Sequence, residues 1–268
     1  MHLDPIIQTA GDAVANAIGI LQFYYENRPD IRQKGIKDLV TQADIESEAA
    51  IIEVIQKRFP DHAILAEESG LSTSTSESRW VIDPLDGTTN FAHGLPLFAV
   101  SIAFQEKGIT QMGIVANPVS GETFSAVIDQ GAFLNDKNIT VSNTAQMEES
   151  LLVTGFPYDI NANPGILLER FNQLVLAAQA VRRLGSAALD LCFVACGRFD
   201  GFWEERLKPW DTAAGEFIAR EAGAKVTNFG NQPFAIDQLE IVAANTHIHP
   251  QLLDLLRIDA AANKPLDG

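Results

Sequence analysis

The sequence predicts an α+β fold, in which a strand-rich first half is followed by a half that alternates helices and strands. The 268 residues are 46% hydrophobic and 20% charged, an ordinary globular balance that allows a large buried core. Residues 98–128 are typical of a meander of antiparallel strands, and after residue 150 the apolar residues return to helical spacing. We therefore expect two halves, 1–150 and 151–268, that form one compact unit.

Two helices are expected before the strands. Residues 4–27 carry apolar side chains at three- and four-residue steps, which is typical of an amphipathic helix. Its inward positions are Ile7, Ala10, Val14, Ala17 and Leu21. After an irregular stretch, Asp44 is expected to begin a second helix, which Pro60 ends. Its inward positions are Ile45, Ala49, Ile52, Ile55 and Phe59.

Short apolar runs predict the strands of the first half. Residues 63–66 form one strand that runs into Glu67 and Glu68. Because side chains alternate on a pleated strand, at most one of these two carboxylates faces inward. Further strands are expected over residues 80–82, 98–104, 111–116 and 122–128.

The second half alternates the two kinds of element. Glu204 is expected at the end of a strand, Asp211 in the opening turn of a helix, and Gly223 at that helix's C-terminal end, where glycine is preferred. The expected strands are 151–154, 200–203, 224–227 and 240–244, and the expected helices are 164–180, 187–195, 213–222 and 250–256. The last few residues are expected to be frayed.

Composition excludes several classes of function. A net charge of −16 argues against a nucleic-acid-binding surface, which needs an excess of Lys and Arg. No apolar run is long enough to span a membrane, and the N-terminus lacks the features of a signal peptide. Cys192 and Cys196 have no partners at zinc spacing and are interpreted as buried reduced thiols. A cytoplasmic location is the default expectation.

The stretch from Trp80 to Pro96 carries the strongest chemical signal. Its strand delivers Asp83 and Asp86, and a short helix is expected to open at Gly87 and Thr88. Clustered carboxylates attract a hard divalent cation, and a Gly-Thr turn at a helix start presents free backbone N–H groups to an anion. Turn chemistry alone would explain either Asp-containing dipeptide, but a turn does not need both carboxylates with hydroxyl and amide side chains after them. The pattern favours a metal-dependent phosphate enzyme.

Further acidic residues are expected at the ends of elements, where a rigid scaffold presents functional groups to a cleft. The set is Asp44, Glu67, Asp83, Asp86, Asp211 and Glu204. Asp44 taken alone is equally explained as a helix cap. Magnesium prefers such oxygen ligands, so two or three ions could be held here with a backbone carbonyl and the substrate phosphate. The five histidines show no zinc pattern.

The spacing of the two aspartates bears on the mechanism. Phosphatases with an aspartyl nucleophile carry D-x-D-G-T, whereas this chain has D-P-L-D-G-T. Pro84 therefore stands where the nucleophile would be. Direct attack by a metal-activated water is the better prediction.

Five motifs together resemble the inositol monophosphatase family, within the lithium-sensitive, magnesium-dependent sugar phosphatases. The resemblance covers residues 4–257, and D-G-T-T-N-F is similar to the inositol monophosphatase branch in particular. The motifs are D-L-V-T-Q-A-D at 38–44, A-E-E-S-G at 66–70, W-V-I-D-P-L-D-G-T-T-N-F-A-H-G-L-P at 80–96, G-S-A-A-L-D-L at 185–191 and W-D-T-A-A-G-E at 210–216. The resemblance implies layers of helices and sheets in the order α-β-α-β-α, with a large antiparallel sheet and a smaller mixed one.

The resemblance also implies metal ligands. A first Mg²⁺ would be held by Glu67, Asp83 and the Leu85 carbonyl, and a weaker third ion by Glu67 with waters. A second ion would be held by Asp83, Asp86 and Asp211.

Catalytic and substrate-binding roles follow from the same resemblance. Thr88 would position and help deprotonate the attacking water, with Asp44 hydrogen-bonded to Thr88 and Glu67 as a further catalytic carboxylate. The backbone N–H groups of Gly87 and Thr88 would bind the phosphate. Contacts to the substrate itself would come from Asp86, Ala187, Glu204 and Asp211.

The remaining implications concern assembly and inhibition. The family resemblance implies a homodimer and inhibition by lithium. Lys34 is expected to neutralise the phosphate region, and Arg182-Arg183 is either an interface element or a solvated basic pair.

Three functions stay open. The leading hypothesis is hydrolysis of myo-inositol 1-phosphate or a related small phosphate monoester. The alternatives are a broader sugar phosphatase that also accepts fructose 1,6-bisphosphate, and a regulatory binding protein that keeps the fold.

Overall fold

The computed structural model describes residues 3–27, 36–72, 74–157, 159–161 and 164–257, without side-chain detail for 36–41. Within these ranges the helices are α1 Asp4–Glu26, α2 Ile36–Arg58, α3 Thr88–His93, α4 Leu167–Ala177, α5 Ala187–Ala195, α6 Pro209–Glu221 and α7 Ile248–Leu256, with a 3₁₀ turn at Met147–Glu149. The strands of the large sheet are β1 Ala63–Ala66, β2 Gly70–Leu71, β3 Ser78–Asp86, β4 Ala99–Glu106, β5 Ile109–Asn117, β6 Glu122–Val127, β7 Ala132–Leu134 and β8 Lys137–Ile139. Those of the small sheet are β9 Leu151–Thr154, β10 Ala180–Arg182, β11 Gly201–Glu205, β12 Lys225–Thr227 and β13 Glu240–Ala244.

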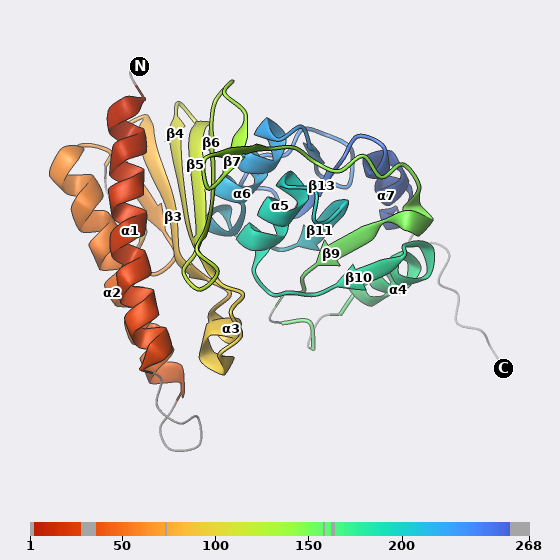
Figure 1. Cartoon of the computed structure of the whole chain (residues 1–268), viewed down its shortest axis with the longest axis horizontal. Coiled ribbons are helices and arrows are strands. Elements are labelled where there is room, and N and C mark those ends of the chain that lie inside the picture. The colour runs from red at the N-terminus through yellow and green to blue at the C-terminus, as the bar shows by residue number, and fades with distance from the viewer. Residues whose placement is uncertain (1–2, 28–35, 73, 158, 162–163, 258–268) are drawn as a thin grey trace.

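The elements stack in five layers, which run from left to right in Figure 1. Helices α1 and α2 cover the outer face of the large sheet, and α5 and α6 lie between the two sheets. Helices α4 and α7 cover the far face of the small sheet. The predicted α-β-α-β-α order is confirmed.

The large sheet is mostly antiparallel, and its strand order is β2-β1-β3-β4-β5-β6-β7-β8. Strand β1 pairs parallel to β3, and all the other neighbours are antiparallel. The run from β4 to β6 is the expected meander, and β7 and β8 extend it. Short turns connect its strands, which is why consecutive strands lie side by side.

The small sheet is mixed, with the order β10-β9-β11-β13-β12. Strand β9 is parallel to both β10 and β11, whereas β13 is antiparallel to β11 and β12. A parallel pair needs a crossover, and helices supply it, which explains the alternating texture of the second half. The α+β class is confirmed, while the boundary at residue 150 stays a prediction.

The large-small alternation of β4 reflects two different neighbours. Phe98 and its large partners point toward α1 and α2, in one core. Ala99 and Ala103 face the central helices, in another core. On the next strand a Cβ added to Gly113 would lie 2.9 Å from the Ala214 carbonyl oxygen of α6. Small residues therefore let the central helices approach the sheet closely.

Two expectations about the first helices are wrong. Helix α2 begins at Ile36, so Asp44 lies inside it and does not begin it. Its buried face carries Asp44, Ser47 and Glu48, whereas Ile45 is 52% exposed. Ile55 is buried as predicted, but apolar spacing misplaced part of the inward face because polar side chains share that face with the apolar ones. In α1 the buried isoleucine is Ile6, and Ile7 is mostly on the outer side.

The other predicted elements are found within a few residues of their expected bounds, and α5 has the bounds predicted. The short strands β2, β7, β8 and β10 were not expected, because two or three residues carry no readable period. Both cysteines are free, Cys192 being buried and Cys196 half-buried. The predictions for Lys34 and for the last residues lie outside the described part of the chain.

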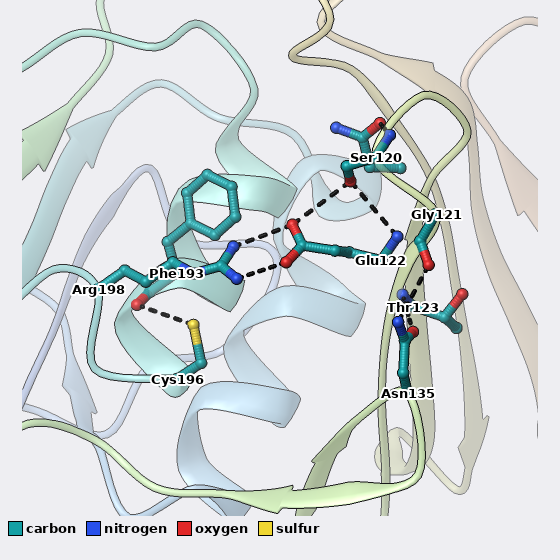
Figure 2. A network of polar contacts seen from close by, with 9 residues as sticks. Ser120, Gly121, Glu122, Thr123, Asn135, Phe193, Cys196 and Arg198 are labelled. Atoms are coloured by element: carbon teal, nitrogen blue, oxygen red, sulfur yellow. Dashed lines mark hydrogen bonds and ion pairs between the residues drawn. The ribbon is translucent and has the colours of Figure 1, made fainter.

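A polar contact ties the helical layer to the large sheet (Figure 2). Arg198, just after α5, donates from both terminal nitrogens to the carboxylate of Glu122 at the start of β6. The same guanidinium lies 5.0 Å from the centre of the Phe193 ring. This pairing lowers the pKa of Glu122.

None of the helices in the described part of the chain is long and apolar enough to cross a lipid bilayer.

Candidate active site

A cavity of about 510 Å³ opens where the two sheets and the central helices meet. Its walls come from the end of β3 and start of α3, the segment after β9, the start of α5, and the segment that joins β11 to α6. Segments distant in sequence therefore bring their ends to one place. A cavity of this size fits a small molecule.

Strand β3 delivers both of its aspartates to this cavity through an irregularity. The pairing of β3 with β4 shifts register between Asp83 and Asp86. Inside the shifted segment, the Leu85 N–H donates to Asp83 Oδ1 at 3.0 Å, and Ser47 of α2 donates to the Pro84 carbonyl. In a regular strand two residues three apart face opposite sides, so the irregularity places both carboxylates on the cavity.

Gly87 makes the turn that follows, and its backbone requires glycine. Its φ is +90°, and a Cβ there would lie 2.8 Å from the Leu97 carbonyl oxygen. Helix α3 starts at the next residue, Thr88, whose hydroxyl donates to the Leu85 carbonyl at 3.1 Å. Backbone N–H groups at such a start are available for an anion.

Asp86 is fixed by a helix from the other half of the chain. Its Oδ2 accepts hydrogen bonds from the Ser186 hydroxyl, which caps α5, and from the Ala188 N–H at 2.8 Å. The carboxylate therefore sits at the positive end of the α5 dipole. The structure places the G-S-A-A motif at 185–188 directly against the D-G-T-T motif.

Asp211 and Glu204 close the opposite wall. Asp211 lies in the first turn of α6, and its Oδ2 accepts from the Lys208 N–H at 2.7 Å. Glu204 is buried on β11 with its carboxylate against Gly155, where any Cβ would overlap it. Burial raises the pKa of Glu204 to about 8, helped by the negative charges of Asp211 and Asp86. Its acid is therefore mostly protonated at neutral pH.

The carboxylates repel one another. Burial is the largest cause of raised pKa values, which are about 7 for Glu67, about 6 for Asp86 and about 7 for Asp211. The pKa of Asp83 is raised well above its usual range by burial and then by the charges of Glu67, Asp86 and Asp211. The charge of Lys208 acts on Asp211 alone among these four acids and is too weak to offset their repulsion, and their oxygen donors are the type that Mg²⁺ prefers.

Asp44 stands apart from this set. It is buried, its Oδ1 has no hydrogen-bond partner among the described side chains, and burial raises its pKa to about 8 with smaller contributions from Glu68, Glu67 and Glu48. Because α2 begins at Ile36, Asp44 is not at a helix start and the cap interpretation is wrong. Among the described residues no hydrogen bond joins Asp44 to Thr88, whose hydroxyl donates to the Leu85 carbonyl.

Comparison with known proteins settles the family. The model of the inositol monophosphatase family matches residues 2–260. The chain belongs to the inositol monophosphatase family. An inositol-1-monophosphatase from Synechocystis sp. is 46% identical over 252 residues, which cover 93% of this chain and 88% of that protein. A protein from Pasteurella multocida named Nus factor SuhB is 43% identical over 258 residues, which cover 95% of this chain and 97% of that protein.

A solved structure agrees. The inositol monophosphatase from Anabaena (Nostoc) sp. has a TM-score of 0.87 against this chain, with 42% sequence identity and coverage of 96% of both chains. Membership of the family supports phosphatase activity, and the predicted resemblance is confirmed.

Most residues singled out from the sequence line the cavity of this family member. They are Glu67, Asp83, Leu85, Asp86, Gly87, Thr88, Ala187, Glu204 and Asp211. Asp44 does not line it. Of the two acids after β1, Glu67 lines the cavity and Glu68 does not, but both lie in the turn that follows the strand, so strand alternation does not explain the difference. No group of three or more His, Cys, Asp or Glu among the described residues is close enough to hold a metal ion as it stands.

Sequence reasoning missed several residues of the site. Arg183, Asp159 and Arg206 line the cavity, and nothing in their spacing could have identified them. Asp190 of α5 is buried, neither of its carboxylate oxygens has a hydrogen-bond partner within the described part of the chain, and burial raises its pKa well above the usual range. The only signal for Asp190 was its place in the G-S-A-A-L-D-L motif.

Proposed function

We propose that this protein is a Mg²⁺-dependent phosphatase that hydrolyses myo-inositol 1-phosphate, or a related inositol monophosphate, by direct attack of water. One observation carries the proposal. Four carboxylates whose pKa values are raised by burial and by one another line a small cavity beside the Gly87 turn. A cation would relieve their repulsion and would then attract a phosphate to a site that is otherwise negative.

The metal ligands proposed are those of the family resemblance. Glu67, Asp83, Asp86, Asp211 and the Leu85 carbonyl would hold two to three Mg²⁺ ions. Bound Mg²⁺ would supply a lowered pKa for the attacking water and offset charge on the phosphate and leaving oxygens. The raised pKa values support the assignment, since these acids bind protons where a cation is expected.

Groups at the start of α3 would bind the phosphate and orient the attacking water. The backbone N–H groups of Gly87 and Thr88 would bind the phosphate oxygens. The Thr88 hydroxyl would turn from the Leu85 carbonyl to orient the water, with Asp44 as its hydrogen-bonding partner. Asp44 suits this role because it is buried and one of its oxygens has no hydrogen-bond partner among the described residues. Hydrogen bonds of this kind commonly tighten only in the substrate complex.

The alcohol half of the substrate would lie on the Glu204 side of the cavity. Because the pKa of Glu204 is about 8, its protonated acid can donate a hydrogen bond to a substrate hydroxyl at neutral pH. Ala187, Asp86 and Asp211 complete the substrate contacts. A broader sugar phosphatase that accepts fructose 1,6-bisphosphate is the alternative, and turnover across a panel of phosphate esters separates the two.

Replacing Asp86 tests the proposal. Asp86→Asn keeps the shape of the side chain but removes a charge needed for the cation, so we expect turnover to fall by about 10³-fold or more while the fold is retained. Asp136→Asn is the matched control, since Asp136 is an exposed turn residue outside the cavity. Near-normal turnover of Asp86→Asn would refute the metal assignment.

A second candidate function is that of a regulatory binding protein, which the name of one relative suggests. Identity of 43% with the Nus factor SuhB of Pasteurella multocida favours it. Pull-down from lysate with and without Mg²⁺, using wild type and Asp86→Asn, tests whether binding is separate from catalysis. A partner that is retained by both proteins would support a second role, and the absence of a reproducible partner would argue against it.

A further inference from the structure

Arg206 holds an unusual backbone conformation at the edge of the proposed active site. Its φ is +65°, in the left-handed region that non-glycine residues rarely adopt. Strained residues of this kind concentrate at functional sites. Among the described residues, five other non-glycines have positive φ, and none of them lines the active-site cavity as Arg206 does.

The position of Arg206 follows from two segments that run together out of the small sheet. Thr154 pairs with Trp203 and donates its hydroxyl hydrogen to the Trp203 carbonyl at 2.6 Å. The next residues, Gly155 and Glu204, are in contact. Further on, Arg206 donates from Nη1 to Asp159 Oδ1 at 3.1 Å. Arg206 is therefore two residues beyond Glu204, at the end of the cavity that receives the alcohol half of the substrate.

Three cationic residues line the cavity, and their surroundings differ. The charge of Arg183 acts on the buried carboxylates Asp190 and Glu204, and the charge of Lys208 acts on Asp211. Arg206 instead pairs with Asp159, whose side chain is 60% exposed. The first two cations offset charge inside the protein, whereas the third is paired with a carboxylate at the surface.

Asp159 is a partner that a ligand can replace. An ion pair with a solvent-exposed carboxylate contributes little to stability, because water screens the two charges. A phosphate dianion carries more charge and matches the planar guanidinium through two parallel hydrogen bonds. A phosphoryl group that reached this end of the cavity would therefore displace Asp159 from Arg206.

We propose that Arg206 is a specificity-determining residue, which recognises a second phosphoryl group on the alcohol half of the substrate in exchange for Asp159. The inference rests on the proposed function, because it takes the scissile phosphate to lie at Gly87 and Thr88. It deepens that function by assigning to Arg206 the preference for phosphate monoesters that carry a second anionic group remote from the one hydrolysed.

The test compares inositol 1-phosphate with inositol 1,4-bisphosphate in the presence of Mg²⁺. Arg206→Gly removes the guanidinium and suits the backbone, so the ratio of KM for the bisphosphate to KM for the monophosphate should rise on the order of tenfold. Asp159→Asn removes the competing carboxylate, so the same ratio should fall several-fold. Lys107→Gly is the matched control, because Lys107 is also a cation with positive φ but lies at the β4–β5 turn outside the cavity.

The KM ratio should change in opposite directions in the two variants, and this distinguishes ligand recognition from a purely structural role of Arg206. A bridge that only held the two segments together would make Arg206→Gly and Asp159→Asn change the ratio in the same direction, and that result would overturn the inference. An unchanged ratio in Arg206→Gly would also overturn it. Should Arg206→Gly fail to fold, Arg206→Lys keeps the charge but loses the planar fork and should raise the ratio by a smaller factor.

Calorimetric binding of inositol 1,4-bisphosphate keeps the test independent of turnover. If wild type hydrolyses neither compound, the proposed function fails, while a dissociation constant that rises about tenfold in Arg206→Gly still supports recognition by this residue. Equal dissociation constants for the two proteins, or no binding to wild type, would overturn the inference.

Discussion

The residues of the site differ in protonation because each has different neighbours. Asp86 is held by Ser186 and the Ala188 N–H, and its pKa is raised only to about 6. Glu204 has no comparable donors and is buried against Gly155, and its pKa rises to about 8. One cavity therefore holds a carboxylate that is mostly ionised at neutral pH and another that is mostly protonated. This division suits a site that must attract a cation and also donate to a hydroxyl.

His249 gives a prediction about stability at the residue scale. Its side chain is buried in α7, Nε2 contacts the Thr227 hydroxyl at 2.9 Å, and Nδ1 has no hydrogen-bond partner among the residues that the structure describes. Burial, with a smaller effect of Lys225, lowers its pKa from 6.5 to about 4. The unfolded chain thus binds a proton that the folded chain resists, so stability present above pH 6.5 is lost as the pH falls toward 4.

His249→Gln keeps a hydrogen-bonding group near Thr227 but cannot be protonated. Between pH 7 and pH 5, wild type should lose about 1 to 2 kcal/mol more of its unfolding free energy than this variant does. Urea unfolding at both pH values measures the difference. Parallel losses in the two proteins would contradict the lowered pKa.

At the scale of elements, the sequence predicted those helices, strands and turns that have a clear apolar period or characteristic turn residues. The stripe of α1, the meander and α5 were found, as was the cluster of motifs around β3. The start of helix α2 and part of its inward face were predicted wrongly, because that face also carries Asp44, Ser47 and Glu48, and apolar spacing selects a face by hydrophobicity alone. The register shift between Asp83 and Asp86, which turns both carboxylates to the cavity, depends on pairing with β4 and leaves no local signal. Arg206 was missed because its conformation is set by tertiary contacts.

Two glycine substitutions should have opposite effects on stability. One glycine lies where α6 approaches β5 closely, and the other has nothing near it. In Gly113→Ala the new Cβ would lie 2.9 Å from the Ala214 carbonyl oxygen, so we expect a loss of about 1–3 kcal/mol. In Gly19→Ala, within α1, the Cβ meets nothing within 4 Å, and we expect a gain of about 0.5–1 kcal/mol from helix propensity. Thermal unfolding of both variants beside wild type measures this. Stabilisation by Gly113→Ala would mean that the layers can move apart without cost.

At the scale of the whole molecule, the site exists only because the two halves of the chain meet. Asp83 and Asp86 come from the large sheet, whereas Asp211 and the N–H groups that hold Asp86 come from the second half. Arg198 and Glu122 add a polar contact between the helical layer and that sheet (Figure 2). A change in how the layers pack would therefore move the carboxylates relative to one another. Unfolding of the protein and loss of Mg²⁺ binding should be coupled for this reason.

That coupling predicts how Mg²⁺ acts at different pH values. Asp86, Glu67 and Asp211 have ordinary pKa values of 3.8, 4.5 and 3.8, which the fold raises to about 6, 7 and 7. Their contribution to stability is fully present below the ordinary values and is lost as the pH rises through the raised ones. Mg²⁺ binds the ionised forms and must release the protons that remain, so its affinity should increase from pH 6 to pH 8 and level off above. The rise in melting temperature on adding Mg²⁺ should accordingly be larger at pH 8 than at pH 6.

Calorimetry in two buffers of different ionisation enthalpy counts the released protons directly. In Asp86→Asn, Mg²⁺ should raise the melting temperature only weakly at both pH values. An effect of Mg²⁺ that does not depend on pH would place the cation away from these carboxylates.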